Sequence, residues 1–272
     1  MSSLFGYEGK KVVLTGGTTG VGAAAVERIA ELGCTDLTVL DIKEPTGPAT
    51  RFIPTDMSDP TSIDAAVEAI GTGVDVLFNN AGVAGVHATD FVIRVNYLGV
   101  RRLTLGLVPG MPRGGAIVNT ASIAGQGWPD NLAKILELIA IEDWDESLAW
   151  LAENDELVSA DAYGFSKQIA QVWTMYSSVH TASAHGVRTN SVCPGPIDTP
   201  LMDDFIKTMT EQVIQWTVEQ SGGTMLTADD IARAVVMLGT DASVAMNGHN
   251  MIADHGFSAS MTTGQVDFSG LG

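Results

Sequence analysis

Cysteine, histidine and basic side chains are scarce in this 272-residue sequence. The two cysteines, Cys34 and Cys193, lie in apolar stretches far apart, which favours a reduced, cytoplasmic protein over a disulfide framework. Lysine and arginine number 14 against 32 aspartates and glutamates, a formal net charge of −18. Nucleic acids and anionic membranes attract positive charge, so neither is expected as a partner. No histidine accompanies the acidic clusters, so no metal site is expected.

Long hydrophobic runs are also absent. No uninterrupted apolar run reaches the roughly 18 residues of a membrane span, and no charged-then-apolar leader opens the sequence. We therefore expect neither a membrane-spanning helix nor a secretion signal. Apolar residues still make up 45% of the chain, enough for a substantial core. Because we find neither a repeat nor a second domain boundary, residues 1–272 are predicted to form a single domain.

A glycine-rich turn follows the first predicted strand, residues 11–15. Residues 16–22 read G-G-T-T-G-V-G, and residues 23–32 have the apolar spacing of a helix. Unpaired N–H groups and the helix dipole at such a turn attract phosphate, and glycines let the backbone come close. The pattern predicts a dinucleotide-binding turn, with a plain tight turn as the alternative.

The next predicted strand, residues 37–40, ends in Asp41. A carboxylate about 20 residues past the glycines can accept hydrogen bonds from a ribose 2′-hydroxyl and repels a 2′-phosphate. No arginine follows Asp41 directly, although Lys43 is close. The sequence therefore favours NAD over NADP as the cofactor.

Strand and helix patterns alternate along the rest of the chain. This predicts the α/β class: a Rossmann fold, with a doubly wound parallel sheet, helices on both faces and ligands at the carboxyl ends of the strands. Further strands are expected at 51–55, 74–78, 115–120, 187–193 and 250–253, and further helices at 59–70, 92–108, 163–184 and 227–238.

Two segments interrupt this alternation. Residues 124–161 carry apolar side chains at helical spacing, and between positions 130 and 161 there are ten acids and one base, Lys134. We expect a helical insertion that packs on the domain, exposes its carboxylates and influences the choice of substrate and partner subunit. Residues 196–226, which also show helical spacing, are predicted to form a substrate lid.

Tyr163 and Lys167 stand four residues apart on a predicted helix and so share one face. The ammonium is expected to stabilise the phenolate and to lower a phenol pKa that starts near about 10. Asn96 lies inside the apolar helix at 92–108, where it is costly unless it is hydrogen-bonded.

These residues resemble, over about residues 8–257, the short-chain dehydrogenase/reductase family. The interval of 40 residues between Ser122 and Tyr163 is longer than the family usually has. The chain is similar in this to the subgroup of 3α-hydroxysteroid dehydrogenase/carbonyl reductases and coniferyl-alcohol-dehydrogenase-like enzymes. The matching segments are T-G-G-T-T-G-V-G at 15–22, Asp56, N-N-A-G at 79–82, Asn96, Ser122, Tyr163 with Lys167, and P-G-P-I-D-T at 194–199.

The resemblance implies four catalytic residues. Tyr163 would be the acid/base on the carbinol oxygen, Lys167 would lower its pKa and bind the nicotinamide ribose, and Ser122 would hydrogen-bond the substrate oxygen. Asn96 would hold a water that links Lys167 to solvent. The implied NAD-binding residues are Gly16, Thr18, Thr19, Gly20, Val21 and Gly22 at the pyrophosphate, Asp41 and Ile42 at the adenosine ribose, Asp56 and Met57 at the adenine, Asn80, Ala81 and Gly82 at the ribose floor, and Tyr163, Lys167, Pro194, Ile197 and Thr199 at the nicotinamide.

No arginine or lysine is placed to meet a charged substrate. The expected function is therefore NAD-dependent hydride transfer between a bulky hydrophobic alcohol (aromatic, alicyclic or steroid-like) and its ketone. An epimerase or dehydratase on the same scaffold and a non-catalytic nucleotide sensor are the alternatives. The family resemblance implies a homo-oligomer, a dimer or a tetramer. His255 could border the site but is interpreted as structural. The predicted pocket walls are Ile123, Trp128, Phe165, Pro194, Met202 and Phe205.

Overall fold

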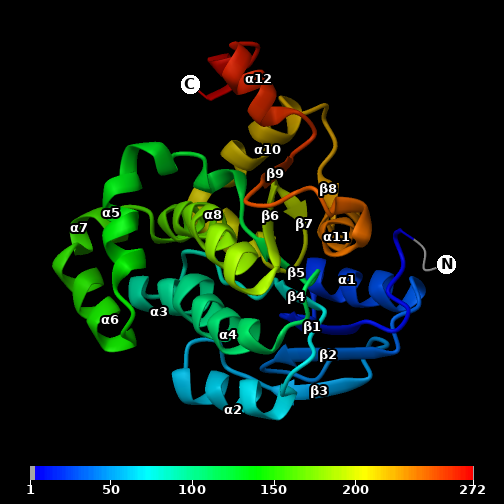
Figure 1. The fold of residues 1–272 in the computed structure, drawn as a ribbon. Helices are drawn as coiled ribbons and strands as arrows, with labels where there is room; N and C mark the ends of the chain where they lie inside the picture. Colours follow the sequence, from blue (N-terminus) through cyan, green and yellow to red (C-terminus); the bar gives the residue numbers. More distant parts are fainter. Residues whose placement is uncertain (1–3, 272) are drawn as a thin grey trace.

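Seven parallel strands form the central sheet of the computed structural model, which describes residues 4–271 (Figure 1). Their order is β3-β2-β1-β4-β5-β6-β9. The chain starts at β1 in the middle of the sheet, adds β2 and β3 on one side, and then crosses to the other side of β1 to add β4, β5, β6 and β9. The order reverses between β1 and β4, where a ligand crevice is expected. The strands are β1 (Lys11–Thr15), β2 (Asp36–Asp41), β3 (Arg51–Pro54), β4 (Val76–Asn79), β5 (Ala116–Thr120), β6 (Arg188–Pro194) and β9 (Asn250–Ala253).

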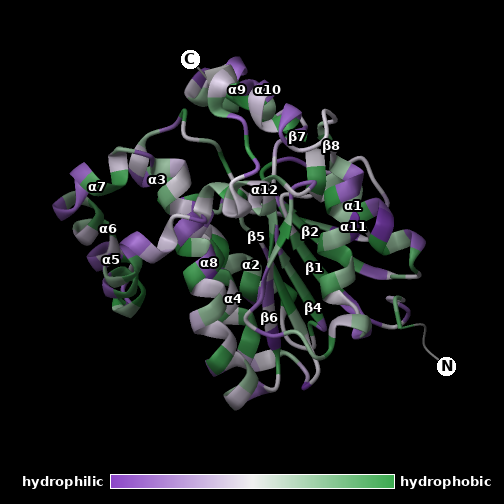
Figure 2. Cartoon of the chain, turned by 90° about the horizontal axis from the view of Figure 1, so that it is seen from above, coloured by the Kyte–Doolittle hydropathy of each residue, from purple (hydrophilic) through white to green (hydrophobic). Residues whose placement is uncertain are grey.

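Helices cover both faces of this sheet, as predicted, and Figure 2 shows the two layers on either side of it. The inner strands read as nearly continuous apolar runs because both of their faces are buried. Val12 and Phe78 pack in the core beneath α1 and α11, whereas Val13 and Leu77 pack in the opposite core beneath α2 and α4. These helices and their neighbour are α1 (Gly20–Glu31), α2 (Pro60–Ile70), α4 (Gly99–Leu107), α8 (Ala162–His180) and α11 (Ala228–Gly239).

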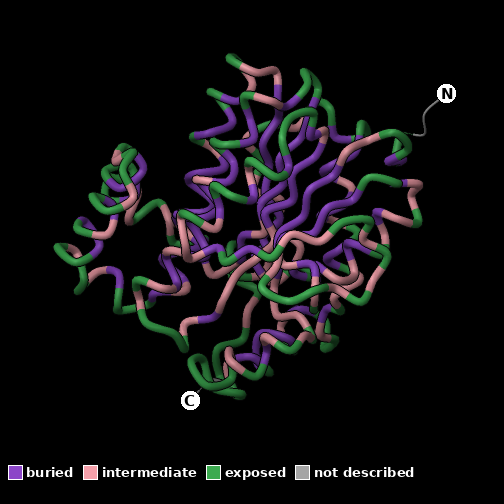
Figure 3. The backbone as a smooth tube through the Cα atoms, turned by 90° about the horizontal axis from the view of Figure 1, so that it is seen from below, coloured by how far each residue is buried: buried purple, intermediate pink, exposed green. Residues whose placement is uncertain are grey.

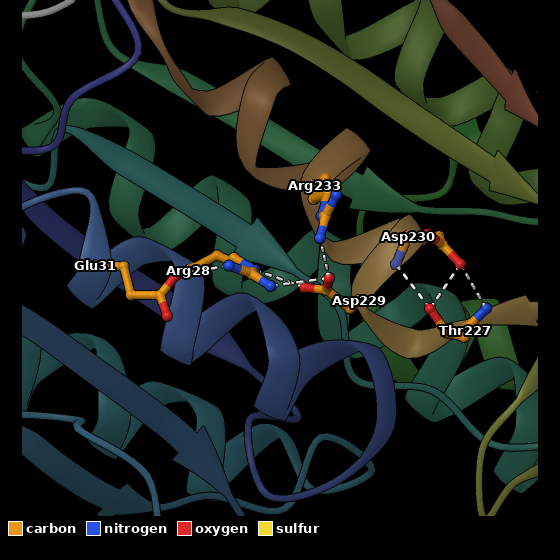
Figure 4. Close-up of polar contacts among 6 residues, drawn as sticks. All are labelled: Arg28, Glu31, Thr227, Asp229, Asp230 and Arg233. Carbon is orange, nitrogen blue, oxygen red and sulfur yellow. Dashed lines mark hydrogen bonds and ion pairs between the residues drawn. The ribbon is translucent and has the colours of Figure 1, made fainter.

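A cluster of ion pairs joins α1, the helix after the glycine-rich turn, to α11 (Figure 4). Asp229 in the first turn of α11 accepts hydrogen bonds from Arg28 Nε at 2.6 Å and from Arg233 Nη2 at 2.6 Å. Thr227 and Asp230 close the same helix end with reciprocal bonds, a capping box. Ion pairs that stay accessible to water contribute little to stability, so the cluster chiefly aligns the two helices.

The helix predicted at 92–108 is present but not continuous. It consists of α3 (Thr89–Ile93), a π-helical turn at Arg94–Leu98, and α4. Asn96 lies in the middle of the π turn, and its side chain forms hydrogen bonds with Val83 and Ser166, outside this helix. The helix predicted at 163–184 is α8, followed by a second π turn at Thr181–His185.

The predicted helical insertion forms a lobe of three helices at the side of the molecule (Figures 2 and 3). Ile135, Leu138 and Trp150 of the lobe pack with Phe165 and Trp173 of α8 in one buried cluster. All ten acids counted in the sequence are exposed, as expected. The lobe consists of α5 (Trp128–Ala140), α6 (Trp144–Glu153) and α7 (Asp155–Ser159).

The segment predicted as a lid contains two short helices and is anchored at both ends by a small second sheet. Several elements here were not predicted, namely this two-stranded sheet and the helices of the C-terminal tail. No helix among residues 4–271 is long and apolar enough to cross a membrane. The elements are β7 (Ile197–Asp198), α9 (Met202–Met209), α10 (Glu211–Glu219), β8 (Leu226–Thr227), α12 (Phe257–Thr263) and a 3₁₀ turn at Phe268–Leu271.

Candidate active site

A cavity of about 720 Å³ opens at the carboxyl ends of the strands, where the strand order reverses. Gly16 after β1, Asp41 at the end of β2 and Asn80 after β4 line one part of it. Ser122 after β5 and Pro194 at the end of β6 line another part. Residues predicted from five separate strand ends therefore meet around one space.

The glycine-rich turn packs too closely for larger side chains. Gly16 has φ +72°, and a Cβ there would lie 2.7 Å from Ala81 Cα. A Cβ on Gly22 would lie 1.8 Å from the carbonyl oxygen of Gly16. The backbone of the turn is thus left open toward the cavity. Thr19, at the start of α1, makes no side-chain cap bond, so the first N–H groups of the helix are available to an anion.

Asp41 lies at the cavity rim beside Ile42, as predicted. Its carboxylate accepts hydrogen bonds from Thr18 N at 3.0 Å and from Lys43 N at 3.3 Å. These bonds fix its direction, and each carboxylate oxygen keeps capacity for another donor. Thr18 therefore holds the Asp41 carboxylate in place through its backbone N–H. Neither Thr18 nor Gly22 lines the cavity, so both support the turn and are not in its exposed surface.

The N-N-A-G segment forms the floor between the two halves of the cavity. Thr15 Oγ1 accepts hydrogen bonds from Asn80 N at 3.0 Å and from Ala81 N at 2.9 Å. Asn80 Nδ2 also donates to Gly16 O at 3.1 Å. The floor is therefore tied to the glycine-rich turn. The other predicted cofactor residues that line the cavity are Thr19, Gly20, Val21, Asp56, Met57, Gly82, Ile197 and Thr199.

Tyr163 and Lys167 lie one turn apart on α8, with both side chains in the cavity wall. Asp161 caps the helix by accepting a hydrogen bond from Gly164 N at 2.8 Å. Lys167 Nζ lies 5.6 Å from the centre of the Tyr163 ring and donates to Thr120 O at 2.9 Å. The three predicted catalytic side chains of Ser122, Tyr163 and Lys167 therefore come together.

Burial dominates the titration of this cluster. It raises the pKa of Tyr163 to about 12, and a hydrogen bond with Ser122 offsets only part of that rise. Burial also lowers the pKa of Lys167 to about 8. The prediction that Lys167 would bring the Tyr163 pKa below its usual value is therefore wrong for the chain by itself. The loss of water around the phenol outweighs the hydrogen bond with Ser122, which is the main effect that lowers the pKa.

Asn96 is buried and hydrogen-bonded, as its position in an apolar helix requires. Its Oδ1 accepts from Val83 N at 2.9 Å, and its Nδ2 donates to Val83 O at 3.0 Å and to Ser166 Oγ at 3.0 Å. It lies behind the main cavity and lines a separate void of about 10 Å³. Asn96 thus connects α8 to the floor segment, since Gly82 and Val83 line the main cavity.

The substrate half of the cavity is apolar. Ile123, Pro194, Met202 and Phe205 line it, as predicted. The Phe205 ring meets the Tyr163 ring edge-to-face, with 4.8 Å between centres. Other apolar side chains of the lining include Val83, Phe91, Val95, Met209, Val213, Ile214, Trp216 and Phe257, and the lid also contributes two polar ones, Asp204 and Thr217.

Two predicted wall residues are wrong. Phe165 is only 2% exposed and packs into the cluster between α8 and the insertion. Two positions after Tyr163, it points away from the helix face that carries the Tyr163 side chain. Trp128 begins α5 and packs against the same cluster. His255 is exposed and contacts Thr224 O at 3.3 Å outside the cavity, which agrees with a structural role.

No grouping of three or more potential metal ligands occurs among residues 4–271. The lining of the cavity offers backbone N–H groups, carboxylates that can accept hydrogen bonds from hydroxyl groups, and the Ser122–Tyr163–Lys167 cluster. A nucleotide-binding α/β fold with that cluster at its central crevice defines a dehydrogenase or reductase.

The chain belongs to the short-chain dehydrogenase/reductase family. Residues 10–133 match the family model described as short chain dehydrogenase, and residues 147–258 match the model described as Enoyl-(Acyl carrier protein) reductase. The interval between the two matches lies in the helical insertion. Members of the family use nicotinamide cofactors, so the chain is an oxidoreductase of this class.

Individual relatives confirm the subgroup. Coniferyl-alcohol dehydrogenase of Pseudomonas sp. (strain HR199 / DSM 7063) is 30% identical over 250 residues, which cover 92% of this chain and 97% of the relative. (+)-Borneol dehydrogenase 1 of Salvia officinalis is 26% identical over 92% of this chain and 94% of its own. The structure of the 3-alpha-hydroxysteroid dehydrogenase from Pseudomonas sp. B-0831 complexed with NADH has a TM-score of 0.76 and 26% identity, covering 93% of this chain and 99% of that one.

Proposed function

We propose that the protein is an NAD-dependent dehydrogenase that interconverts bulky hydrophobic alcohols, aromatic, alicyclic or steroid-like, and their ketones. The observation that carries this proposal is the Ser122–Tyr163–Lys167 cluster facing an apolar half-cavity. Among the described residues that line the cavity, Lys167 is the only lysine or arginine. A phosphorylated or carboxylated substrate would therefore find no cationic partner other than the catalytic lysine.

The cavity fits a nicotinamide dinucleotide, which when bound supplies the hydride acceptor or donor and, in oxidised form, a positive charge. The backbone of the glycine-rich turn and the first turn of α1 would hold its phosphates. Asp41 would accept the ribose hydroxyls of the adenosine, and its charge would repel a 2′-phosphate, which supports NAD over NADP. Asp56 and Met57 would flank the adenine, and Ile197 with Thr199 would hold the carboxamide.

Tyr163 is the group that moves the proton in this proposal. Its phenolate oxygen takes the proton of the carbinol hydroxyl in oxidation, and its hydroxyl returns one in reduction. The Ser122 hydroxyl hydrogen-bonds the same substrate oxygen and stabilises negative charge on it. Lys167, held by Thr120 O, provides the cation that stabilises the phenolate. The role proposed for Asn96 is to hold a water between Lys167 and solvent.

The test is turnover of NAD⁺ with three secondary alcohols, cyclohexanol, borneol and 1-phenylethanol, in which the NADH formed is measured by its absorbance. We expect oxidation of at least one of them, and a rate lowered about 10²–10⁴-fold by Tyr163→Phe, with NADH affinity retained. Full activity in Tyr163→Phe would contradict the mechanism. Binding of NADH without any alcohol turnover would instead favour the nucleotide-sensor alternative.

We further propose a homodimer in the cytoplasm. The insertion packs on α8 and covers part of a helix surface through which two more chains could associate. Cys34 and Cys193 are buried and unpaired, which supports a reducing compartment. A sedimentation mass of four chains would contradict the dimer.

A further inference from the structure

We propose that Phe257 and Trp216 form a fixed end wall of the substrate half-cavity, and that the C-terminal tail, residues 254–271, sets the upper size of the substrate. This inference rests on the proposed function, because it concerns the same cavity. Phe257 belongs to α12 and Trp216 to the lid, so neither is part of the motifs at the strand ends.

The wall consists of two aromatic rings from segments distant in sequence. Trp216 on α10 is 7% exposed, and Phe257 is the first residue of α12. Both line the cavity, and their rings meet edge-to-face at 5.7 Å with an interplanar angle of 86°. Edge-to-face pairs of this kind contribute beyond simple burial and fix the relative orientation of the rings.

One clamp joins the tail to the lid. Trp216 Nε1 donates to Asp267 O at 2.8 Å, and the Phe268 ring lies 5.6 Å from the Trp216 ring. Asp267 N donates in turn to Gln220 Oε1 at 2.9 Å. The indole is therefore held on its polar edge by the tail and presents an apolar side to the cavity.

A second clamp joins the tail to the catalytic loop. Asp254, 6% exposed, accepts hydrogen bonds from Gly256 N at 2.9 Å and from Ser258 N at 2.7 Å, and also binds the Ser258 hydroxyl. Gln126 Nε2 donates to Ser258 Oγ at 2.6 Å. Gln126 follows the turn Ile123–Gly125, directly after Ser122. Phe257 thus stands between two anchored points.

Because the tail is bound to the lid on one side and to Gln126 on the other, Phe257 and Trp216 are held in place and limit the length of substrate that fits. A long fused-ring ketone would have to displace Phe257, which costs the ring pair and the burial of an aromatic side chain. A single-ring ketone is smaller and is expected to bind without displacing Phe257. Replacing Phe257 with alanine should open space at this end without altering Ser122, Tyr163 or the cofactor cradle.

Calorimetric titration of the enzyme–NAD⁺ complex with cyclohexanone and with 2-decalone tests the inference without turnover, because an oxidised cofactor cannot reduce a ketone. We expect Phe257→Ala to raise the decalone-to-cyclohexanone affinity ratio by about 10-fold or more. Met261→Ala is the matched control, since Met261 lies on the same helix, is 43% exposed and is outside the cavity lining. It should leave the ratio unchanged.

The clamp itself is tested with Trp216→Phe, which keeps a ring and removes the donor to Asp267 O. We expect chymotrypsin to cleave after Phe257 faster than in the unaltered protein, with product masses identifying the site. An unchanged affinity ratio in Phe257→Ala, an equal shift in Met261→Ala, or unchanged cleavage in Trp216→Phe would overturn the inference. Failure of alcohol oxidation alone would count against the proposed function and not against the wall, because the ketone titration needs no turnover.

Discussion

Replacing Asn96 with alanine should destabilise the protein more than its small change in volume suggests. The side chain makes three hydrogen bonds, two to the backbone of Val83 and one to Ser166, at 2.9, 3.0 and 3.0 Å. At about 0.5–1.5 kcal/mol each, their loss should lower the free energy of unfolding by about 2–4 kcal/mol. For a chain of this length that corresponds to a fall in Tm of roughly 4–16 °C.

The same substitution should weaken NADH binding, because Asn96 holds Val83 and, next to it, Gly82 in the floor of the cavity. The assay is thermal unfolding of the cofactor-free protein together with a fluorescence titration of NADH. Asn131→Ala is the control. That side chain donates one hydrogen bond, to Gln168 Oε1 at 2.8 Å, on the insertion and away from the cavity. Its loss should cost about 1 kcal/mol and leave NADH affinity unchanged.

One combination of results would refute this reasoning. If Asn96→Ala lowers Tm no more than Asn131→Ala and binds NADH equally well, the bonds to Val83 do not hold the floor. A large fall in Tm with unchanged NADH affinity would limit the role of Asn96 to joining α8 to the π turn.

Two further predictions concern charge. Asp41→Ser should raise the ratio of kcat/KM for NADP to kcat/KM for NAD by about 10-fold or more, because the 2′-phosphate no longer meets a carboxylate. The ratio is measured with one alcohol and both cofactors, and an unchanged ratio would contradict the role given to Asp41. Because burial lowers the pKa of Lys167 to about 8, the unfolded chain binds more protons than the folded one above that pH. The free energy of unfolding should therefore rise with pH between about 8 and the ordinary lysine pKa near 10.4. A Lys167→Met variant should lose this rise, measured by denaturant titration of the cofactor-free protein at several pH values. If the stability of the variant and of the unaltered protein changes with pH in parallel, the lowered pKa of Lys167 is wrong.

The sheet and the cofactor half of the cavity could be predicted because local sequence determines them. A parallel strand buried on both faces reads as an apolar run, and K-V-V-L-T at β1 does so. The turn after it must be glycine where a Cβ would strike Ala81 or the Gly16 carbonyl. Asp41 reaches the cavity rim simply because it is the last residue of the next strand, β2. Each feature depends on residues close in sequence, so the pattern is visible without the fold.

The pKa of Tyr163 could not be predicted in the same way. Spacing places Lys167 on the same helical face, and the structure confirms that placement. The sign of the shift depends on how much water the fold removes from the phenol, which is a property of the surrounding lid and loop. A sequence motif specifies the partners of a titrating group, whereas its dielectric surroundings come from segments that the motif does not contain.

The insertion and the lid illustrate the same limit for substrate recognition. Both are amphipathic helical segments, and their apolar spacing predicts a buried face without naming what covers it. The face of the insertion packs against α8, and among the described residues of 124–161 only Ala124 lines the cavity. The lid places Met202, Phe205 and Trp216 in the cavity wall. The expectation that the insertion selects the substrate is therefore not supported, because the apolar part of the cavity wall comes from other segments, among them Ile123 after β5, Pro194 at the end of β6, and the lid.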